Sequence, residues 1–453
     1  MERNLATTPE NPLRLKRFSQ FAKDLRAGKT SCRKATTSYL ERISALDPKL
    51  QSYVHIDADN ATSTAIKLDQ QLQDGSDPSP LLGLPVAVKD IITVKGMPTK
   101  VGSRLNVEDL IQPEGSFISR LKSAGCVILG KTRTIEFAAG AHNISHPTPW
   151  NPTYPDTHHA PGGSSSGSAV AQAAGLCAFA IGTDTGGSVR VPAALCSLFG
   201  FKPSKGLWPM DGVFPVCQDL DTIGLITSSA ADAAFVFSVL SNVPCPQALP
   251  SLTEIRLGIP DNHYFENLDP EVRDGFKVAV SRLKAAGVVF ESIELPEAEE
   301  AASVFAGLVP YDLIQTLGQD RFLAARKIID PTAFQRLSPA LDLTEEATML
   351  VRDRLQKLQG LGAQRLEGLD GFISPTTPLL PRPVTSCSSL KQAADFTARV
   401  LQNSRPANIY NLCAASVPIR HLPENRPVGL QVQMVSGKDA DVLSLAQGIE
   451  LLL

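Results

Sequence analysis

Two short loops rich in glycine and serine carry the residue types best suited to covalent chemistry. The first reads GGSSSGS at residues 162–168, and the second reads TGGS at residues 185–188. Glycines allow backbone conformations with positive φ and bring bare N–H groups close to a reacting atom. A serine in such a loop can act as a nucleophile while neighbouring amides stabilise an oxyanion. The two loops therefore point to serine-based nucleophilic catalysis.

Other functions of glycine-rich loops fit these residues less well. A phosphate-binding loop of the Walker type needs a Lys-Ser/Thr pair after its last glycine, and GGSSSGSAV has none. A dinucleotide fingerprint needs the spacing G-x-G-x-x-G, which residues 162–168 also lack. Flexible linkers share this composition, but the segment between the loops, 169–181, is apolar and contains six alanines. That segment favours burial over a linker.

A lysine follows a short apolar run upstream of both loops. Residues 84–88 predict a buried strand, and Lys89 ends it within the segment GLPVAVKD. A lysine at a strand end is usually solvated. A catalytic role would require burial, because burial lowers the pKa of an amine and makes the neutral base available near neutral pH.

Three segments, GLPVAVKD, PGGSSSGSAVA and GTDTGGSVRVPAA, follow one another along the chain. Together they resemble the amidase signature family, serine amidohydrolases with a Ser–cis-Ser–Lys triad. The resemblance implies that Ser188 is the nucleophile, that Ser164 is the bridging serine of a cis peptide, and that Lys89 is the general base and acid. It covers about residues 31–450 and is densest at 83–224.

The resemblance also suggests roles around the triad. The candidate oxyanion donors are the backbone N–H groups of Thr185, Gly186, Gly187 and Ser188. The candidate supporting residues are Ser165, which could hydrogen-bond the nucleophile, and Asp184 and Arg190, which could pair and brace the turn. The candidate substrate-pocket residues are Phe137, His142, Tyr311 and Thr377.

The family's layout implies an α/β fold, a single large domain in which a twisted mixed sheet is sandwiched between layers of helices. Residues 1–75 would form an N-terminal helical segment packed on the core, and residues 76–453 the amidase signature core. A variable helical insertion at about 255–367 would influence substrate choice. The implied reaction is cleavage of an amide C–N bond through a serine acyl-enzyme, without a metal or organic cofactor.

Three alternatives remain open at this stage. The chain could be the glutaminase component of a tRNA-dependent amidotransferase, which shares the core and passes ammonia to a partner. It could also hydrolyse small urea-like or carboxylated amides. A catalytically silent binding or scaffold protein is disfavoured because Lys89, Ser164 and Ser188 are all present.

A histidine-rich segment departs from the family pattern. Four of the seven histidines lie within residues 142–159, at positions 142, 146, 158 and 159. Several imidazoles can bind zinc, but their spacing is irregular and no set of carboxylates or thiols accompanies them. We expect a surface loop forming one wall of the substrate mouth and no metal.

The composition is typical of a soluble enzyme and limits its partners. The chain has 453 residues, 43% of them hydrophobic, with a net charge of −3, so no electrostatic footprint for nucleic acid or an anionic membrane is present. The eight cysteines are scattered, which indicates reduced core residues. The N-terminal residues lack the apolar core of a secretory signal. We expect a cytoplasmic enzyme with a small-molecule amide substrate and possible homodimer formation.

Hydrophobic periodicity predicts the elements that must position these residues. Helices are expected at 18–27, 31–43, 61–72, 117–124, 230–240 and 269–287. Residues 169–181 are expected to form a helix that starts from the first loop and leads into a strand or tight turn at the second. Strands are expected at 84–88, 126–131 and 255–259, and the family resemblance implies a strand ending in a turn within 371–378 and closing strands at 411–418 and 427–431. The chain is expected to remain largely helical after residue 287, up to about residue 367, and to end inside an apolar helix at 449–453.

Overall fold

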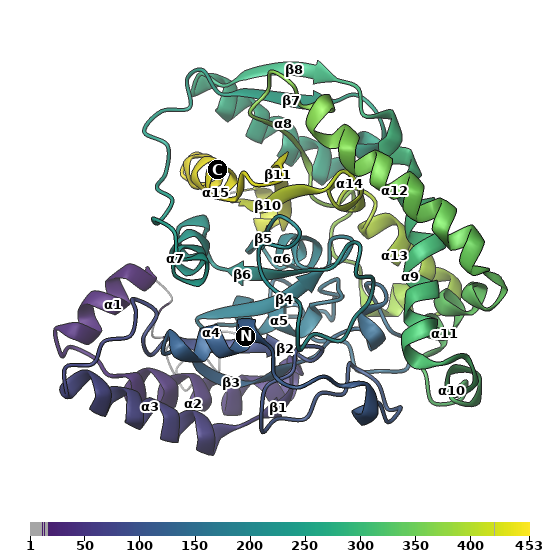
Figure 1. Cartoon of the computed structure of the whole chain (residues 1–453). Helices are drawn as coiled ribbons and strands as arrows, with labels where there is room; N and C mark the ends of the chain where they lie inside the picture. The colour runs from purple at the N-terminus through teal and green to yellow at the C-terminus, as the bar shows by residue number, and fades with distance from the viewer. Residues whose placement is uncertain (1–10, 12, 14–16, 421) are drawn as a thin grey trace.

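One mixed sheet of eleven strands organises the fold. The computed structural model describes residues 11, 13, 17–420 and 422–453. The strand order is β1-β3-β2-β4-β6-β5-β10-β11-β9-β7-β8. The sheet runs from β1 at the bottom of Figure 1 to β8 at the top, and helices cover both sides of it. The expected α/β fold, with a mixed sheet between helical layers, is confirmed.

The strands are short, and those at the centre of the sheet are entirely buried. Their bounds are β1 Tyr53–Ile56, β2 Pro85–Lys89, β3 Val127–Thr132, β4 Phe179–Asp184, β5 Phe199–Lys202, β6 Thr222–Thr227, β7 Arg256–Pro260, β8 Val289–Ile293, β9 Gly371–Pro375, β10 Leu412–Ile419 and β11 Val428–Val435. The sequences PVAVK, VILGKT and FAIGTD of β2, β3 and β4 are buried at every position. Strands covered on both faces read as nearly continuous apolar runs rather than as alternating patterns.

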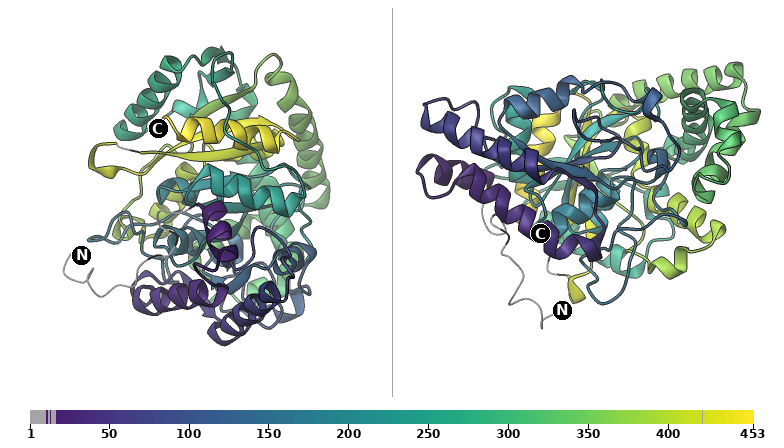
Figure 2. Two further views of the ribbon diagram at one scale, coloured as in Figure 1. Left: turned by 90° about the vertical axis from the view of Figure 1, so that its left-hand side faces the viewer. Right: turned by 90° about the horizontal axis from the view of Figure 1, so that it is seen from below.

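Fifteen α-helices surround the sheet within the described residues. Their bounds are α1 Phe18–Arg26, α2 Cys32–Leu50, α3 Ala58–Gln73, α4 Ser116–Ser123, α5 Ser166–Ala173, α6 Arg190–Leu195, α7 Ala230–Ser241, α8 Pro270–Ala285, α9 Ala301–Leu317, α10 Gln319–Ala324, α11 Pro331–Leu337, α12 Glu345–Arg365, α13 Leu390–Val400, α14 Arg405–Ile409 and α15 Asp439–Glu450. Helices α7 and α15 lie to the left of the central strands in Figure 1, and α9, α12 and α13 lie to the right. Seen from below in Figure 2, α2 and α3 and the group α9–α12 lie at opposite ends of the molecule.

Local sequence signals explain several helix boundaries. Ser31 caps α2 by accepting a hydrogen bond from the Lys34 amide, as its position before the helix predicts. The segment 169–181 is not one helix, because α5 ends at Ala173 and β4 begins at Phe179. Gly175, with a φ of +66°, lies just past the end of α5, where a left-handed residue commonly terminates a helix.

The structure differs from the expected layout at three further places. The N-terminal segment contributes a strand as well as helices, because β1 pairs with β3. The region 255–367 contains the strand β7, expected at 255–259, and also the strand β8, which was not expected and pairs parallel with β7 at the far edge of the sheet. The last helix ends at Glu450, and the three leucines after it lie outside it. For β1 and β8, pairing with another strand overrides the local pattern.

The remaining sequence expectations concern cysteines and membranes. All eight cysteines are free, and seven of them are buried, Cys245 being partly exposed. Across the described residues, no helix combines the length and the apolar character that crossing a membrane requires. Residues 1–10, which contribute to the expected lack of a secretory signal, lie outside the described residues.

Candidate active site

Lys89 lies in the buried interior of the protein. It ends β2, its side chain is completely inaccessible to solvent, and its ammonium group donates hydrogen bonds to Ser164 Oγ at 2.7 Å and Thr183 Oγ1 at 2.8 Å. Burial lowers the pKa of Lys89 to about 7, although the charges of Asp221 and Asp184 oppose this effect. An amine with this pKa can accept and return a proton near neutral pH.

Strand pairing explains why these groups meet. Strands β2 and β4 run parallel, with Val88 opposite Ile181, so their carboxyl ends lie at the same edge of the sheet. This pairing places Thr183, near the end of β4, beside Lys89. Strand β6 runs antiparallel to β4 with Thr222 opposite Asp184, so the chain entering β6 reaches the same edge. Residues from three strands therefore converge there.

The first glycine–serine loop lies against the second. The Gly163–Ser164 peptide bond is cis, and Ser164 is completely buried. The Ser165 amide donates to the carbonyl oxygen of Ser188 at 3.2 Å, which places the adjacent Ser164 next to the turn that carries Ser188. The side chain of Ser165 contacts the backbone of Thr183 instead, at 3.4 Å. The backbone of Ser165 therefore contacts the backbone of Ser188. The hydroxyl group of Ser165 instead links the loop to β4.

The turn at Ser188 offers backbone donors on its concave side. The N–H group of Gly187 already donates to Asp184 Oδ1 at 2.8 Å. Within the described residues, the N–H groups of Thr185, Gly186 and Ser188 make no intramolecular hydrogen bond. Of the four amides suggested by the sequence, these three are therefore the ones available to an oxyanion.

An internal ion pair braces this turn. Asp184 and Arg190 are both fully buried, and the guanidinium binds the carboxylate through Nη2 at 2.8 Å and Nε at 3.0 Å. Arg190 also donates to Gln431 Oε1 at 2.7 Å and Asn408 Oδ1 at 2.6 Å. Burial alone would raise the pKa of Asp184, but the charge and hydrogen bonds of Arg190 outweigh it and hold the pKa below its usual range. The pairing expected from the sequence is present.

Removing Arg190 is expected to destabilise the protein strongly. Arg190→Gln leaves the Asp184 carboxylate buried without its cation, which should lower the free energy of unfolding by about 3–5 kcal/mol. Denaturant titration monitored by circular dichroism measures the change. Arg256→Gln is the matched control, because Arg256 pairs with Glu291 at the surface and its side chain is 52% exposed, so about 0–1 kcal/mol is expected. Equal effects of the two variants would contradict the structural role of Arg190.

Asp221 also contacts the turn that carries Ser188. Its carboxylate accepts hydrogen bonds from Thr185 Oγ1 at 2.5 Å and from the amides of Val216 and Cys217, each at 2.9 Å. Burial raises the pKa of Asp221 to about 6, although these hydrogen bonds and Lys89 work against the rise. Asp221 therefore positions Thr185 and places a titratable negative charge within electrostatic reach of Lys89.

Ser188 lines a cavity of about 400 Å³. Thr185, Gly186 and Ser188 contribute to its lining, together with residues 138–140. The walls come mainly from α9, α11 and α13, helices that follow the well-matched part of the sequence. Two arginines, Arg336 and Arg405, also line the cavity.

The four pocket residues suggested by the sequence do not line this cavity. Phe137 is buried and stacks on Phe214, and His142 packs edge-on against Phe396. Tyr311 packs against the main hydrophobic core, and the Thr377 hydroxyl donates to the carbonyl oxygen of Leu379. The cavity beside Ser188 is lined instead by residues of α9, α11, α13 and α14.

The histidines of residues 142–159 make separate contacts with different neighbours. His142 is only 2% exposed, and burial lowers its pKa to about 4. His158 stacks on Trp150 and His159 stacks on Tyr154. None of these residues lines the cavity beside Ser188, so the expected role of this segment as a wall of the substrate mouth is not supported.

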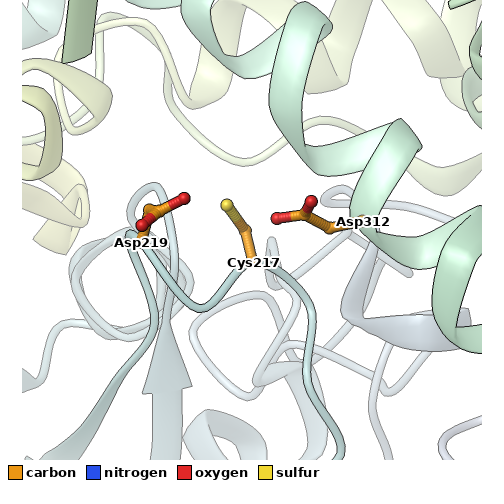
Figure 3. Close-up of side chains that lie close together, drawn as sticks. All are labelled: Cys217, Asp219 and Asp312. Carbon is orange, nitrogen blue, oxygen red and sulfur yellow. The ribbon is translucent and has the colours of Figure 1, made fainter. Parts of the chain in front are cut away.

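One group of described side chains has the spacing that a metal ion needs. The ligand atoms of Cys217, Asp219 and Asp312 lie within 4.8 Å of one another, and Figure 3 shows the cysteine between the two carboxylates. Arg352 already pairs with both carboxylates, with its Nε 2.9 Å from Asp219 Oδ2 and its Nη2 in contact with Asp312. The single positive charge of Arg352 offsets part of the negative charge of the two carboxylates, so we assign the cluster as an ion-pair network.

Sequence patterns alone missed several site residues. Thr183 and Asp221 lie in segments that resemble the family, but nothing in their spacing identifies their contacts with Lys89 and Thr185. Arg336 and Arg405 lie outside every recognised motif. These four residues can be recognised as part of the candidate site only from their contacts in the tertiary structure.

Comparison with known proteins supports the fold described above. Residues 34–443 match the family model described as Amidase. The chain is 33% identical over 417 residues to 2-amino-5-chloromuconic acid deaminase of Comamonas testosteroni, with 90% of each chain covered. It is 30% identical over 440 residues to a glutamyl-tRNA(Gln) amidotransferase subunit of Geobacter metallireducens, covering 88% of this chain and 89% of that one.

A solved amidase structure superimposes with a TM-score of 0.87 at 28% identity, covering 96% of this chain and 100% of the other. The chain therefore belongs to the amidase signature family. It is an amidohydrolase, an enzyme that cleaves amide C–N bonds.

Proposed function

We propose that this amidohydrolase cleaves a small amide through an acyl-enzyme formed on Ser188. The observation that carries the proposal is the fully buried Lys89 amine, 2.7 Å from Ser164 Oγ and next to the turn of Ser188. Its pKa of about 7 leaves a large fraction of it neutral near neutral pH. Neutral amine is the form that can activate a serine hydroxyl group.

The proposed reaction has two halves. Ser188 Oγ attacks the amide carbon while its proton passes through the Ser164 hydroxyl group to Lys89 Nζ. The oxyanion accepts hydrogen bonds from the amides of Thr185, Gly186 and Ser188. The proton then returns through the same relay to the leaving nitrogen as the C–N bond breaks. A water molecule, deprotonated by the same relay, releases the carboxylic acid and regenerates Ser188.

A trapping experiment tests the covalent step directly. The purified enzyme is incubated with a panel of simple aliphatic and aromatic amides, quenched in acid and digested for mass spectrometry. An acyl mass on the peptide that contains Ser188 is the expected result, and added hydroxylamine should convert the acyl group to the hydroxamate. Turnover without an acylated Ser188 or hydroxamate would argue for direct attack by water.

The pH dependence should report Lys89. Protonation removes the base, so kcat/KM is expected to rise with pH through an apparent pKa of about 7 and to fall about tenfold per pH unit well below it. A rate profile between pH 5 and 9 with an amide that does not ionise in this range measures the effect. A flat profile, or activity that falls as pH rises through 7, would contradict the role of Lys89.

A variant of Asp221 tests whether Lys89 is the group that titrates in this profile. The negative charge of Asp221 raises the pKa of Lys89, so Asp221→Asn is expected to move the apparent pKa to lower pH. Asp274→Asn is the matched control, because Asp274 is a surface residue whose side chain is 74% exposed. Its profile should coincide with that of the unaltered enzyme.

The similarity to the amidotransferase protein supports a second candidate, a glutaminase that passes ammonia to a partner. Glutamine carries an α-ammonium group, for which a carboxylate is the strongest partner. Among the described residues that line the cavity, none is Asp or Glu. This lining favours an independent amidase. Hydrolysis of other amides together with failure to release ammonia from glutamine would support that choice.

We also infer that the enzyme works in a reducing compartment, consistent with the cytoplasm. All eight cysteines are free in the structure, and burial raises the pKa of several of them, including Cys126, Cys177 and Cys196. Buried thiols with raised pKa are poor nucleophiles and persist reduced where glutathione and thioredoxin act.

A further inference from the structure

The cavity beside Ser188 is apolar, yet it carries net positive charge. Its walls include alanines, prolines and Phe305, and its ionisable lining residues are only Arg336 and Arg405 among the residues that the structure describes. Arg336 comes from α11 and Arg405 begins α14, so two elements far apart in the chain each bring one guanidinium group to the same small space. Both arginines are half-buried, and withdrawing a cation from water without supplying an anion is unfavourable.

Arg405 has no counterion among the described residues. Its Nε is buried and makes no hydrogen bond, and its guanidinium lies over the face of Phe305, 5.4 Å from the ring centroid. Its stem lies against the proposed oxyanion turn, because a Cβ atom built on Gly186 would come within 3.3 Å of Arg405 Cγ. Arg405 is therefore close to the place where the amide must react.

Arg336 is also not neutralised. Its guanidinium donates to the carbonyl oxygen of Ala139, which also lines the cavity. The nearest acidic influence on it is Asp330, whose carboxylate already accepts hydrogen bonds from Ser145 and Thr332. The positive charge of Arg336 lowers the pKa of Arg405 further, after burial, which places the two cations within electrostatic reach of each other.

We propose that the substrate carries a carboxylate, separate from the scissile amide, that binds to Arg405 and Arg336. This inference rests on the amide hydrolysis proposed above and names its substrate class. Guanidinium and carboxylate form charge-assisted hydrogen bonds, and both arginines line the cavity without an acidic partner among the described residues. The apolar walls and the volume of about 400 Å³ fit a short hydrocarbon chain between the carboxylate and the amide. Because the described lining holds no acidic residue, it disfavours amides that also carry an ammonium group.

The test compares substrates that differ only in charge. Adipic acid monoamide carries the carboxylate, and 6-oxoheptanamide replaces it by a methyl ketone of similar shape. We expect kcat/KM for the acid to exceed that for the ketone, and the shorter glutaric and succinic monoamides show which chain length fits. The ratio of the two kcat/KM values is the measured quantity.

The arginine variants assign that ratio to the two residues. Arg405→Gln and Arg336→Gln are each expected to lower the ratio of acid to ketone by about 10–100-fold, the loss typical of one hydrogen bond to a charged group. Arg405→Lys should restore part of the ratio by restoring the charge. Arg256→Gln, at the far edge of the sheet, is the matched control and should leave the ratio unchanged. Circular dichroism establishes that each variant is folded.

The outcomes separate this proposal from the proposed function. Equal turnover of the acid and the ketone by the unaltered enzyme would overturn the carboxylate site and leave amide hydrolysis intact. If none of the amides is hydrolysed, the binding of adipate, measured by calorimetry, tests the carboxylate site. Binding that weakens in Arg405→Gln supports the site, and no binding, or binding unaffected by that variant, overturns it. Labelling of Ser188 by a fluorophosphonate tests the nucleophile independently of either result.

Discussion

Ser188→Ala is expected to lower kcat/KM for amide hydrolysis by about 10⁴–10⁶-fold, the range seen when a serine nucleophile is removed from a catalytic unit. The alanine keeps the turn, its amides and the cavity, so substrate binding should change little. The loss should therefore lie in kcat rather than in KM. Steady-state kinetics on the most active amide of the panel measure both constants.

Labelling by a fluorophosphonate gives a second readout for the same variant. The unaltered enzyme should be labelled at Ser188, and Ser188→Ala should not be labelled at all. Ser166→Ala is the matched control, because Ser166 lies in the neighbouring loop and its hydroxyl group donates to the Arg133 carbonyl oxygen at 3.4 Å. Full labelling and turnover by Ser188→Ala would contradict the acyl-enzyme mechanism and the catalytic role proposed for the two loops.

Lys89→Met is expected to lower kcat by about 10²–10⁴-fold, the usual contribution of a positioned general base. Methionine fills similar space but cannot take a proton from Ser164. Lys89→Arg should be equally inactive, because a guanidinium stays protonated at any accessible pH. The two variants together separate loss of charge from loss of the base.

Folding should survive the loss of Lys89. Burial holds its pKa near 7 in the folded state, well below about 10.4 in an unfolded chain. Between these values the unfolded state binds more protons, so the contribution of Lys89 to stability becomes less favourable as pH falls from about 10 toward 7. Lys89→Met removes this effect, and its melting temperature at pH 7 should therefore not fall far.

A buried lysine elsewhere provides the control for this experiment. Lys202 on β5 is 1% exposed, and its ammonium group donates to the carbonyl oxygens of Pro203 and Leu412. Lys202→Met should retain far more activity than Lys89→Met. Similar activities of these two variants would show that the loss comes from altered packing of the sheet rather than from the base.

Much of the catalytic centre can be predicted from the sequence because its residues lie in contiguous motifs. The glycine pairs and serines at 162–168 and 185–188 define the two loops, and the apolar run before Lys89 predicts its strand. The helices at 18–27, 230–240 and 269–287 follow from apolar periodicity and match α1, α7 and α8 closely. These loops, this strand and these helices each depend on a short stretch of sequence, so sequence patterns are enough to predict them.

The lining of the cavity beside Ser188 could not be predicted in this way. Phe137, His142, Tyr311 and Thr377 have residue types that suit a pocket, yet none of them lines the cavity. The cavity is instead bounded by helices whose patterns indicate only that one face is buried. Periodicity shows that a face is buried, but it does not show what that face packs against.

The sequence by itself determined the family, the fold class and the identity of the serines and lysine proposed for the reaction, because each depends on residues close together in the chain. Only the tertiary structure decided that Lys89 is wholly buried between Ser164 and Thr183, and that Arg336 and Arg405 share one cavity. Burial and the distance between charged groups set a pKa and a binding preference. Both arise when strands and helices far apart in the chain come into contact.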